Sequence, residues 1–369
     1  MKYKIDAEKA IANTGNWYRL KKIMERAKNG EHLTVGFVGG SITMGSVSSV
    51  PESCYAYLVF DWWKKTFPKA KFTYRNAGIG GTNSQFAVAR VHTDVLQYNP
   101  DFVITEFSVN DEDTNHFLET FEGLIRNLYD YKTKPAVLIV NNVCYDDGKN
   151  AQAQHNKVGE AYQIPCISMQ SSIYPLVQAG MIPRKEITPD DLHPNDTGHE
   201  LVARNIIHFL EKVYASTTED MELTMPAPIS RNQYEHSTRY QNDSDVFISN
   251  GFLADMRKQE SITQFFRKGW TADHVGDSIC FQVEGTGMAV QYRKSIQKPT
   301  PIAIAIVDGD EEHAVVLDGN FMEDWGDCLY LQTLTEHSEK KKHRLEIRIA
   351  KTHANDVVPF YLVSVIGSY

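Results

Sequence analysis

Separate segments of the sequence carry residue types that together could hydrolyse an ester through a serine nucleophile. Ser41 follows the apolar stretch "TVGFVGG", and Asp190 and His193 stand close together in "DDLHPNDTGHE". A serine hydroxyl is a poor nucleophile until a histidine takes its proton, and an acid must orient that histidine. Within one turn of chain the Asp190 carboxylate can reach one ring nitrogen of His193, which leaves the other for Ser41. The spacing therefore predicts a Ser-His-Asp arrangement.

The same reaction needs hydrogen-bond donors for the negative charge that develops on the carbonyl oxygen. "NAGIGG" ends in Gly80 and Gly81, where the chain can approach a ligand closely, and "SVND" contributes the Asn110 side-chain amide. With the backbone N–H of Ser41, these groups would form an oxyanion hole. A phosphate-binding loop is the alternative for such glycines, but no lysine stands at the P-loop spacing, and a dinucleotide fingerprint would lack its third glycine.

Neighbouring polar residues have simpler explanations. Asp191 is the alternative to Asp190 as the orienting acid, whereas Asp196 is expected to cap the last helix. His199 stands at the start of that helix, and we expect it to be structural. The acidic segment "NDEDTNH" fits no Ca²⁺ or Zn²⁺ pattern, so the sequence predicts no metal site there.

The first part of the chain alternates stretches typical of strands and of helices. Apolar stretches with strand character occur at 33–38, 71–76, 102–107, 136–140 and 164–168. Helical spacing appears between them, as in "SCYAYLVFDWWKKTF" and "HFLETFEGLIRNLYDY". This alternation favours an α/β domain with a doubly wound, five-stranded parallel sheet. Such sheets bind ligands at the carboxyl ends of their strands, which is where Ser41 stands.

The character of the sequence changes after a last helical stretch, "GHELVARNIIHFLEKVYAS". Residues 218–230 are acidic and polar and contain prolines, as is typical of a linker. Helical spacing then nearly disappears, and short strand-like stretches such as "SICFQVEG" and "RLEIRIA" alternate with turns. We therefore predict an α/β domain over 1–217, a linker over 218–230 and an antiparallel β-sandwich over 231–369.

Composition narrows the range of partners and compartments. The net charge of −9 offers no basic face for nucleic acid. No stretch approaches the apolar length of a membrane span, and the charged N-terminal segment has helical character without a signal-peptide pattern. The five cysteines share no close spacing, which argues against a disulfide framework. We expect a cytoplasmic protein with reduced thiols, and the sequence leaves a homo-oligomer open.

Taken in order, these blocks resemble the SGNH hydrolase superfamily, also called GDSL-type esterases. "GGSIT" is similar to the family's nucleophile block, "NAGIGG" to the second, "SVND" to the third and "DDLHPNDTGH" to the fifth. The resemblance covers roughly 33–215 and implies a flavodoxin-like fold. It implies the catalytic residues Ser41, Asp190 and His193, and an oxyanion hole of Ser41, Gly81 and Asn110 in which Gly80 is the alternative glycine. One departure is the glycine before the serine, where many members have aspartate.

The predicted sandwich resembles a jelly-roll carbohydrate-binding module, and the domain order resembles carbohydrate esterase family seventeen. That family's acetyl-mannan esterases remove 2-O-acetyl groups, so an acetylated oligosaccharide is the implied substrate, and no cofactor is implied. Met44 and Trp325 are candidate substrate contacts, with Trp325 on a sandwich loop leaning over the cleft. The alternatives are an esterase or lysophospholipase acting on other acyl esters, which would need an apolar groove, and a non-catalytic glycan-binding protein.

Overall fold

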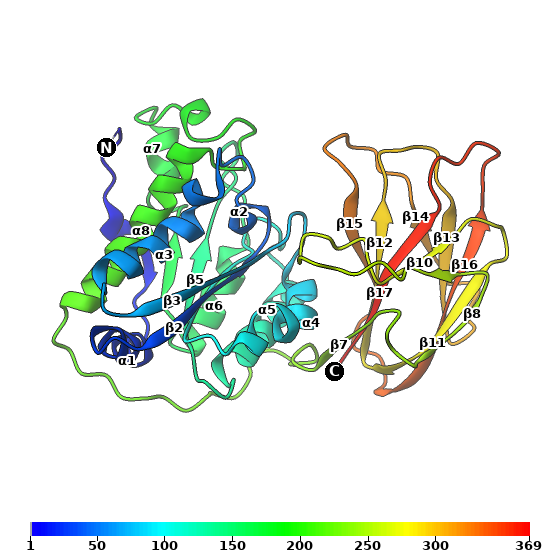
Figure 1. Ribbon diagram of the computed structural model, residues 1–369, viewed down its shortest axis with the longest axis horizontal. Coiled ribbons are helices and arrows are strands. Elements are labelled where there is room, and N and C mark those ends of the chain that lie inside the picture. The colour runs from blue at the N-terminus through cyan, green and yellow to red at the C-terminus, as the bar shows by residue number, and fades with distance from the viewer. Residues whose placement is uncertain (1) are drawn as a thin grey trace. The chain divides into compact units, whose positions relative to one another are not determined.

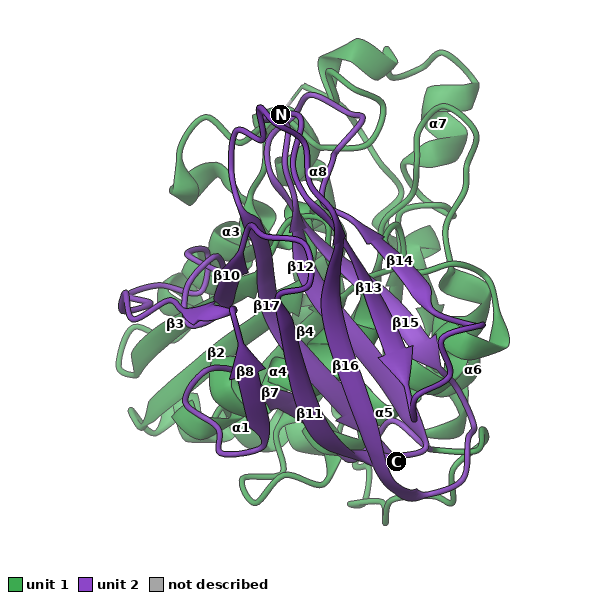
Figure 2. Cartoon of the chain, turned by 90° about the vertical axis from the view of Figure 1, so that its right-hand side faces the viewer, with its two compact units in different colours: residues 1–232 green, residues 233–369 purple. Residues whose placement is uncertain are grey.

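The computed structural model describes residues 2–369, which form two compact units. The first ends at Asn232 and the second runs from Gln233 to Tyr369, as the two colours of Figure 2 show. The change from helical to strand-like sequence patterns therefore falls close to the boundary between them.

A six-stranded sheet forms the centre of the first unit (Figure 1). Its strand order is β1-β6-β5-β4-β2-β3. Its strands are β1 (Ile11–Asn13), β2 (His32–Gly39), β3 (Lys71–Gly78), β4 (Phe102–Glu106), β5 (Ala136–Asn141) and β6 (Cys166–Ser168). Strands β2 to β6 are parallel, which confirms the predicted five-stranded parallel sheet. Strand β1 adds an antiparallel edge next to β6.

Helices cover both faces of this sheet. The helices described in this unit are α1 (Tyr18–Lys28), α2 (Ser41–Met44), α3 (Tyr55–Thr66), α4 (Ser84–Asp94), α5 (Asn115–Tyr129), α6 (Gln152–Ala161), α7 (Tyr174–Gln178) and α8 (Asp196–Ala215). Single 3₁₀ turns occur at η1 (Ala7–Ala10), η2 (Pro51–Ser53), η3 (Leu96–Tyr98) and η4 (Arg184–Glu186). Helices α1, α3 and α8 pack together on one face, and α4, α5 and α6 on the other (Figure 1).

The predicted elements arise from the expected apolar patterns, with differences near the N-terminus. All residues of β4 and β5 are buried, as continuous apolar strands covered on both faces must be. The N-terminal segment forms η1 and the short β1 before α1, so our expectation of helix there was only partly right. A three-residue strand is too short to show an alternating apolar pattern in the sequence. Strand β1 is recognised by its antiparallel pairing with β6.

The second unit consists of antiparallel strands in two sheets. Its strands are β7 (Ser237–Tyr240), β8 (Phe247–Asn250), β9 (Leu253–Ala254), β10 (Trp270–Ala272), β11 (Ser278–Gly285), β12 (Gly287–Lys294), β13 (Ile302–Val307), β14 (Val315–Asp318), β15 (Cys328–Thr335), β16 (Lys341–Lys351) and β17 (Phe360–Ser368). One sheet has the order β15-β12-β17-β10-β9, with β7 also on β17, and the other β14-β13-β16-β11-β8.

The core of this unit lies between the two sheets. Along β11, Ile279, Phe281 and Val283 are buried while intervening residues are more exposed, which is the alternation of a strand with one face in a core. Trp270 is fully buried and packs edge-on against Phe281 with ring centroids 5.3 Å apart. This arrangement confirms the predicted all-β second domain.

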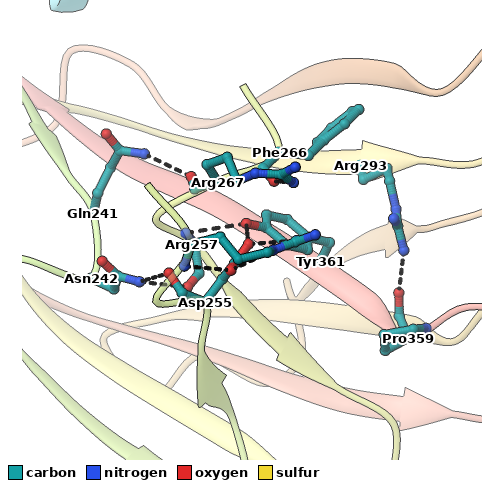
Figure 3. A network of polar contacts seen from close by, with 10 residues as sticks. Gln241, Asn242, Asp255, Arg257, Phe266, Arg267, Arg293, Pro359 and Tyr361 are labelled. Carbon is teal, nitrogen blue, oxygen red and sulfur yellow. Dashed lines mark hydrogen bonds and ion pairs between the residues drawn. The ribbon is translucent and has the colours of Figure 1, made fainter. Parts of the chain in front are cut away.

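Polar contacts hold the long segment between β9 and β10 against β17 (Figure 3). The Tyr361 hydroxyl donates to Asp255 at 2.6 Å, and Arg257 pairs with the same carboxylate at 2.7 Å. Asn242 donates to the Asp255 carbonyl at 2.7 Å. The hydrogen bonds from Arg257 are the main reason that the pKa of Asp255 lies well below its usual value.

The segment predicted as a linker lies along α5 in the first unit. Tyr129 and Arg126 donate to the carbonyls of Leu223 and Pro226, and the Ile229 N–H donates to a Glu122 carboxylate oxygen at 2.7 Å. Within residues 2–369, none of the helices has the length and apolar character needed to cross a bilayer.

Candidate active site

The bend that presents Ser41 depends on glycines at the ends of β2 and β3. A Cβ on Gly40 would lie 2.2 Å from the Asn110 side-chain oxygen, and one on Gly78 would lie 2.2 Å from the backbone nitrogen of Met44. Real Cβ atoms do not approach other atoms this closely, so a side chain at either position would displace α2 or Asn110. The close approach explains why a glycine precedes the serine.

Ser41, His193 and Asp190 form one continuous hydrogen-bonded chain. The Ser41 Oγ lies 2.8 Å from His193 Nε2, and His193 Nδ1 lies 2.6 Å from Asp190 Oδ2. The other Asp190 oxygen accepts the His193 backbone N–H at 2.7 Å. Partial burial alone would raise the pKa of Asp190, but hydrogen bonds from the His193 ring and from backbone N–H groups lower it. The carboxylate thus stays ionised and can support a positive imidazolium.

The alternative acid, Asp191, faces other partners. Its carboxylate lies 3.0 Å from both Arg184 and Lys185. Its φ of 71° also turns the chain sharply after Asp190. The structure therefore places Asp190, and not its neighbour, on the His193 ring.

Polar contacts at the start of α8 hold the segment that carries His193. Asn195 is the N-cap of α8, and its side chain accepts the Gly198 N–H at 3.1 Å. Our expectation that Asp196 caps this helix was wrong. Asp196 instead accepts the backbone N–H and the hydroxyl of Ser49 at 2.8 and 2.6 Å, which ties the loop after α2 to α8. These hydrogen bonds lower the pKa of Asp196.

His199 lies in the core, and within the described part of the chain its ring nitrogens form no hydrogen bond with Ser41, Asp190 or His193. It is fully buried, and its ring stacks on Tyr55 with centroids 6.2 Å apart. Burial lowers its pKa to about 4, so the ring is neutral at physiological pH.

The candidate oxyanion donors come from the loops after β3 and β4. A Cβ on Gly80 would lie 3.7 Å from the Ser41 Cβ, so this glycine lies directly beside the nucleophile. Gly81 has a φ of 67°, the left-handed conformation that glycine adopts without strain. The Asn110 amide packs against Gly40. Both glycines thus remain candidates for the backbone donor, and Gly81 stays our prediction.

A buried contact between an aspartate and a histidine, which sequence reasoning missed, connects these two loops. Asp111, next to Asn110, accepts the Ser84 N–H at the start of α4 at 2.9 Å and lies 3.0 Å from His155 Nε2. The side chains of Asp111 and His155 are fully buried, and the His155 ring stacks on Phe121 at 3.7 Å. The aspartate of "SVND", Asp111, was the available signal for this contact, but its partner His155 is distant in the sequence.

Arg90 is a second residue that the sequence analysis did not single out. This fully buried side chain donates to the carbonyls of Ala77 and Gly39 at 2.8 and 3.3 Å, and it pairs with Asp94 at 2.9 Å. It therefore joins the carboxyl ends of β2 and β3, immediately below the bend with Ser41. An arginine within the apolar stretch "SQFAVARV" was the available signal.

The two candidate substrate contacts lie in different units. The Met44 side chain is 39% exposed, and its methyl carbon lies 3.5 Å from where a Cβ on Gly80 would stand. It is thus beside the nucleophile. Trp325 lies on the loop between β14 and β15, is 57% exposed and packs edge-on against Phe321 at 5.0 Å. An exposed aromatic ring of this kind is available to a ligand.

Replacing Asn110 with alanine tests its place in the oxyanion hole. We expect kcat for 4-nitrophenyl acetate to fall by about 10²- to 10³-fold, because the amide would bind the carbonyl oxygen most strongly once it carries negative charge. KM should change little. Asn250→Ala, at an exposed position on β8, is the control and should keep the wild-type kcat. An unchanged kcat in Asn110→Ala would exclude this role.

A serine hydrogen-bonded to a histidine, which is itself hydrogen-bonded to an acid, at the carboxyl edge of a doubly wound sheet defines the class of serine hydrolases. Residues 37–201 match the family model described as the GDSL-like Lipase/Acylhydrolase family. Comparison with curated proteins finds no match.

Solved structures similar to this chain extend the match over both units. One is a crystal structure of a two-domain esterase (CEX) active on acetylated mannans, with 59% identity and a TM-score of 0.98, covering 99% of both chains. Another, of such an esterase co-crystallized with mannopentaose, has 58% identity and a TM-score of 0.96, covering 99% of this chain and 98% of that one. The chain belongs to the GDSL-like lipase/acylhydrolase family and is a carboxylic ester hydrolase.

Proposed function

We propose that this protein is a serine carbohydrate esterase that removes O-acetyl groups, in particular 2-O-acetyl groups, from mannan-derived oligosaccharides. The observation that carries the proposal is the 58–59% identity, over both units, to esterases active on acetylated mannans. The contact between Ser41 and His193 supports the chemistry, because it provides a nucleophile with its base.

In the proposed mechanism, acyl transfer takes place in two steps. His193 takes the proton of Ser41 as the hydroxyl oxygen attacks the acetyl carbonyl, and Asp190 stabilises the imidazolium that forms. The oxyanion is held by the N–H groups of Ser41 and Gly81 and by the Asn110 amide. The sugar hydroxyl leaves with the proton from His193. Water then repeats the sequence on the acetyl-enzyme and releases acetate.

Substrate class is tested by incubating the enzyme with acetylated oligosaccharides from mannan, xylan and pectin. Mass spectrometry before and after incubation reports the loss of acetyl groups, and we expect it to be fastest for mannan. Nuclear magnetic resonance of the recovered mannan oligosaccharides identifies the hydroxyl that was freed. Faster deacetylation of xylan or pectin would contradict the proposed substrate.

We also propose that the second unit acts as a carbohydrate-binding module and that Trp325 contacts the glycan. Trp325→Ala should lower kcat/KM for acetylated mannan oligosaccharides by about tenfold, since an aromatic platform for a sugar ring is lost. It should leave the hydrolysis of 4-nitrophenyl acetate unchanged. Met322→Ala is the matched control, because this side chain is on the same loop and 84% exposed. Equal effects of Trp325→Ala on both substrates would reject the contact.

The cytoplasmic location also remains part of the proposal. All five cysteines are unpaired, which agrees with a reducing compartment. Fractionation of cells that produce the protein, followed by detection in the cytoplasmic and secreted fractions, would test it.

A further inference from the structure

A chain of buried polar groups lies beneath the nucleophile and is not used in the acyl-transfer steps. Glu106, the last residue of β4, lies beside Gly39 in the sheet and is fully buried. Its Oε2 accepts a hydrogen bond from the hydroxyl of Thr43, two residues after Ser41 in α2, at 3.1 Å. The Thr43 hydroxyl also lies 2.8 Å from the hydroxyl of Tyr55 in α3. This chain therefore links the centre of the sheet to the helix that begins with the nucleophile.

The surroundings of Glu106 disfavour a negative charge. Its second carboxyl oxygen is buried without a hydrogen-bond partner among the described residues. Burial and the nearby Asp111 raise the pKa of this carboxyl, whereas the side chains of Asn142 after β5 and of Thr43 lower it, and none of these groups is a cation. A buried carboxylate without a countercharge is costly, whereas a neutral carboxyl group is tolerated. Burial is the main reason that the pKa of Glu106 rises to about 7.

We propose that Glu106 is a positioning residue: in its neutral form it anchors α2 through Thr43 and thereby fixes the direction of the Ser41 hydroxyl. This inference rests on the proposed role of Ser41 as the nucleophile. The geometry supports it because Thr43 is the residue of this single-turn helix whose side chain reaches the centre of the sheet, while the Asn76 amide holds the Thr43 carbonyl at 2.7 Å.

Ionisation of Glu106 has a defined consequence for catalysis. It places a negative charge in a buried group that is hydrogen-bonded to the helix carrying Ser41, where acyl transfer also develops negative charge, and like charges oppose each other in a poorly solvated site. We therefore expect kcat to fall as the pH rises through the pKa of Glu106. The thiol and the phenol that interact with it ionise elsewhere, because burial raises the pKa of Cys54 to about 11 and that of Tyr55 well above its usual value.

The same ionisation affects folding stability, with a sign that follows from the two states. In the unfolded chain Glu106 ionises at the ordinary pKa of 4.5, but in the folded protein at about 7. Between these values the folded state holds a proton that the unfolded chain has lost. The contribution of Glu106 to the unfolding free energy is therefore present at low pH and is lost as the pH rises toward 7.

The test compares kcat and KM for 4-nitrophenyl acetate across neutral and alkaline pH in a set of variants. Thr43→Val should lower kcat about tenfold or more with little change in KM, because the anchor of α2 is lost. Thr43→Ser should restore most of kcat. Thr105→Val is the matched control, because Thr105 is a buried threonine of β4 whose hydroxyl has no hydrogen-bond partner among the described residues.

Glu106→Gln retains a neutral group for Thr43 but cannot ionise. We expect it to retain most of kcat at neutral pH and to lose the alkaline decline of the wild type. Its melting temperature should also vary less with pH between 4.5 and 7. An unchanged alkaline decline in Glu106→Gln, or a wild-type kcat in Thr43→Val, would overturn the inference. Failure of the proposed function would give a different result from failure of this inference. In that case the wild type would hydrolyse no acetyl ester, or Ser41→Ala would keep its activity.

Discussion

Ser41→Ala is expected to lower kcat for 4-nitrophenyl acetate by about 10⁵- to 10⁶-fold, which is the largest single loss for this protein. The reason is chemical: without the hydroxyl no acetyl-enzyme forms, although the oxyanion donors can still favour attack by water. KM for an acetylated oligosaccharide should change little, because binding does not need the hydroxyl. The fold should be retained, since alanine removes only one buried oxygen.

A neighbouring serine gives the control for this experiment. In the part of the chain that the structure describes, the Ser48 hydroxyl donates to the Gly45 carbonyl at 2.6 Å and to no catalytic group, so Ser48→Ala should keep wild-type kcat. Acetyl transfer to Ser41 can also be observed directly, as acetylated protein in quenched reactions of the wild type by mass spectrometry. Substantial activity in Ser41→Ala, or an acetyl group on another residue, would mean that the nucleophile lies elsewhere.

Asp190→Asn is expected to lower kcat by about 10⁴-fold while leaving the geometry of the site intact. The asparagine amide can donate to His193 Nδ1, which favours the tautomer with its proton on Nε2. That nitrogen then cannot take the proton of Ser41. The lost carboxylate also no longer stabilises the imidazolium. Steady-state kinetics with 4-nitrophenyl acetate measure the effect.

The adjacent acid provides the matched control. Asp191→Asn removes contacts with Arg184 and Lys185, both partly exposed, and such ion pairs contribute little to stability. Asparagine also tolerates the positive φ at this position. We expect the kcat of Asp191→Asn to lie within about twofold of the wild-type kcat, which corresponds to a small change in activation free energy. Equal losses in both variants would mean that the acids act together and not through Asp190 alone.

Much of the first unit follows from local patterns. Each of the five parallel strands was predicted from a short stretch with strand character, and β4 and β5 are buried along their whole length, as strands covered on both faces must be. The glycines around Ser41 and the order of the sequence blocks indicated an ester hydrolase. The family match at residues 37–201 confirmed that class. The resemblance of the whole chain to two-domain carbohydrate esterases also agrees with the similar solved structures.

Other features depend on contacts between distant segments, which no local pattern encodes. Strand β1 exists because it pairs with β6, about 150 residues later in the chain. The N-cap of α8 is Asn195, and the neighbouring Asp196 accepts hydrogen bonds from Ser49, which lies near it only when the loop after α2 packs against α8. The contact of Asp111 with His155 likewise joins segments that the sequence keeps apart.

The sequence by itself determined which residue types were available and at which strand ends they stand. The reason is that apolar periodicity and glycines determine strands, helices and turns through short stretches of chain. Only the tertiary structure decided that Asp190 rather than Asp191 meets the His193 ring, and that Gly80 lies beside Ser41. It also buried Glu106 beneath α2, where its pKa changes. The physical reason is that hydrogen bonding and desolvation depend on distances of a few ångströms, which are set when the sheet and its helices pack.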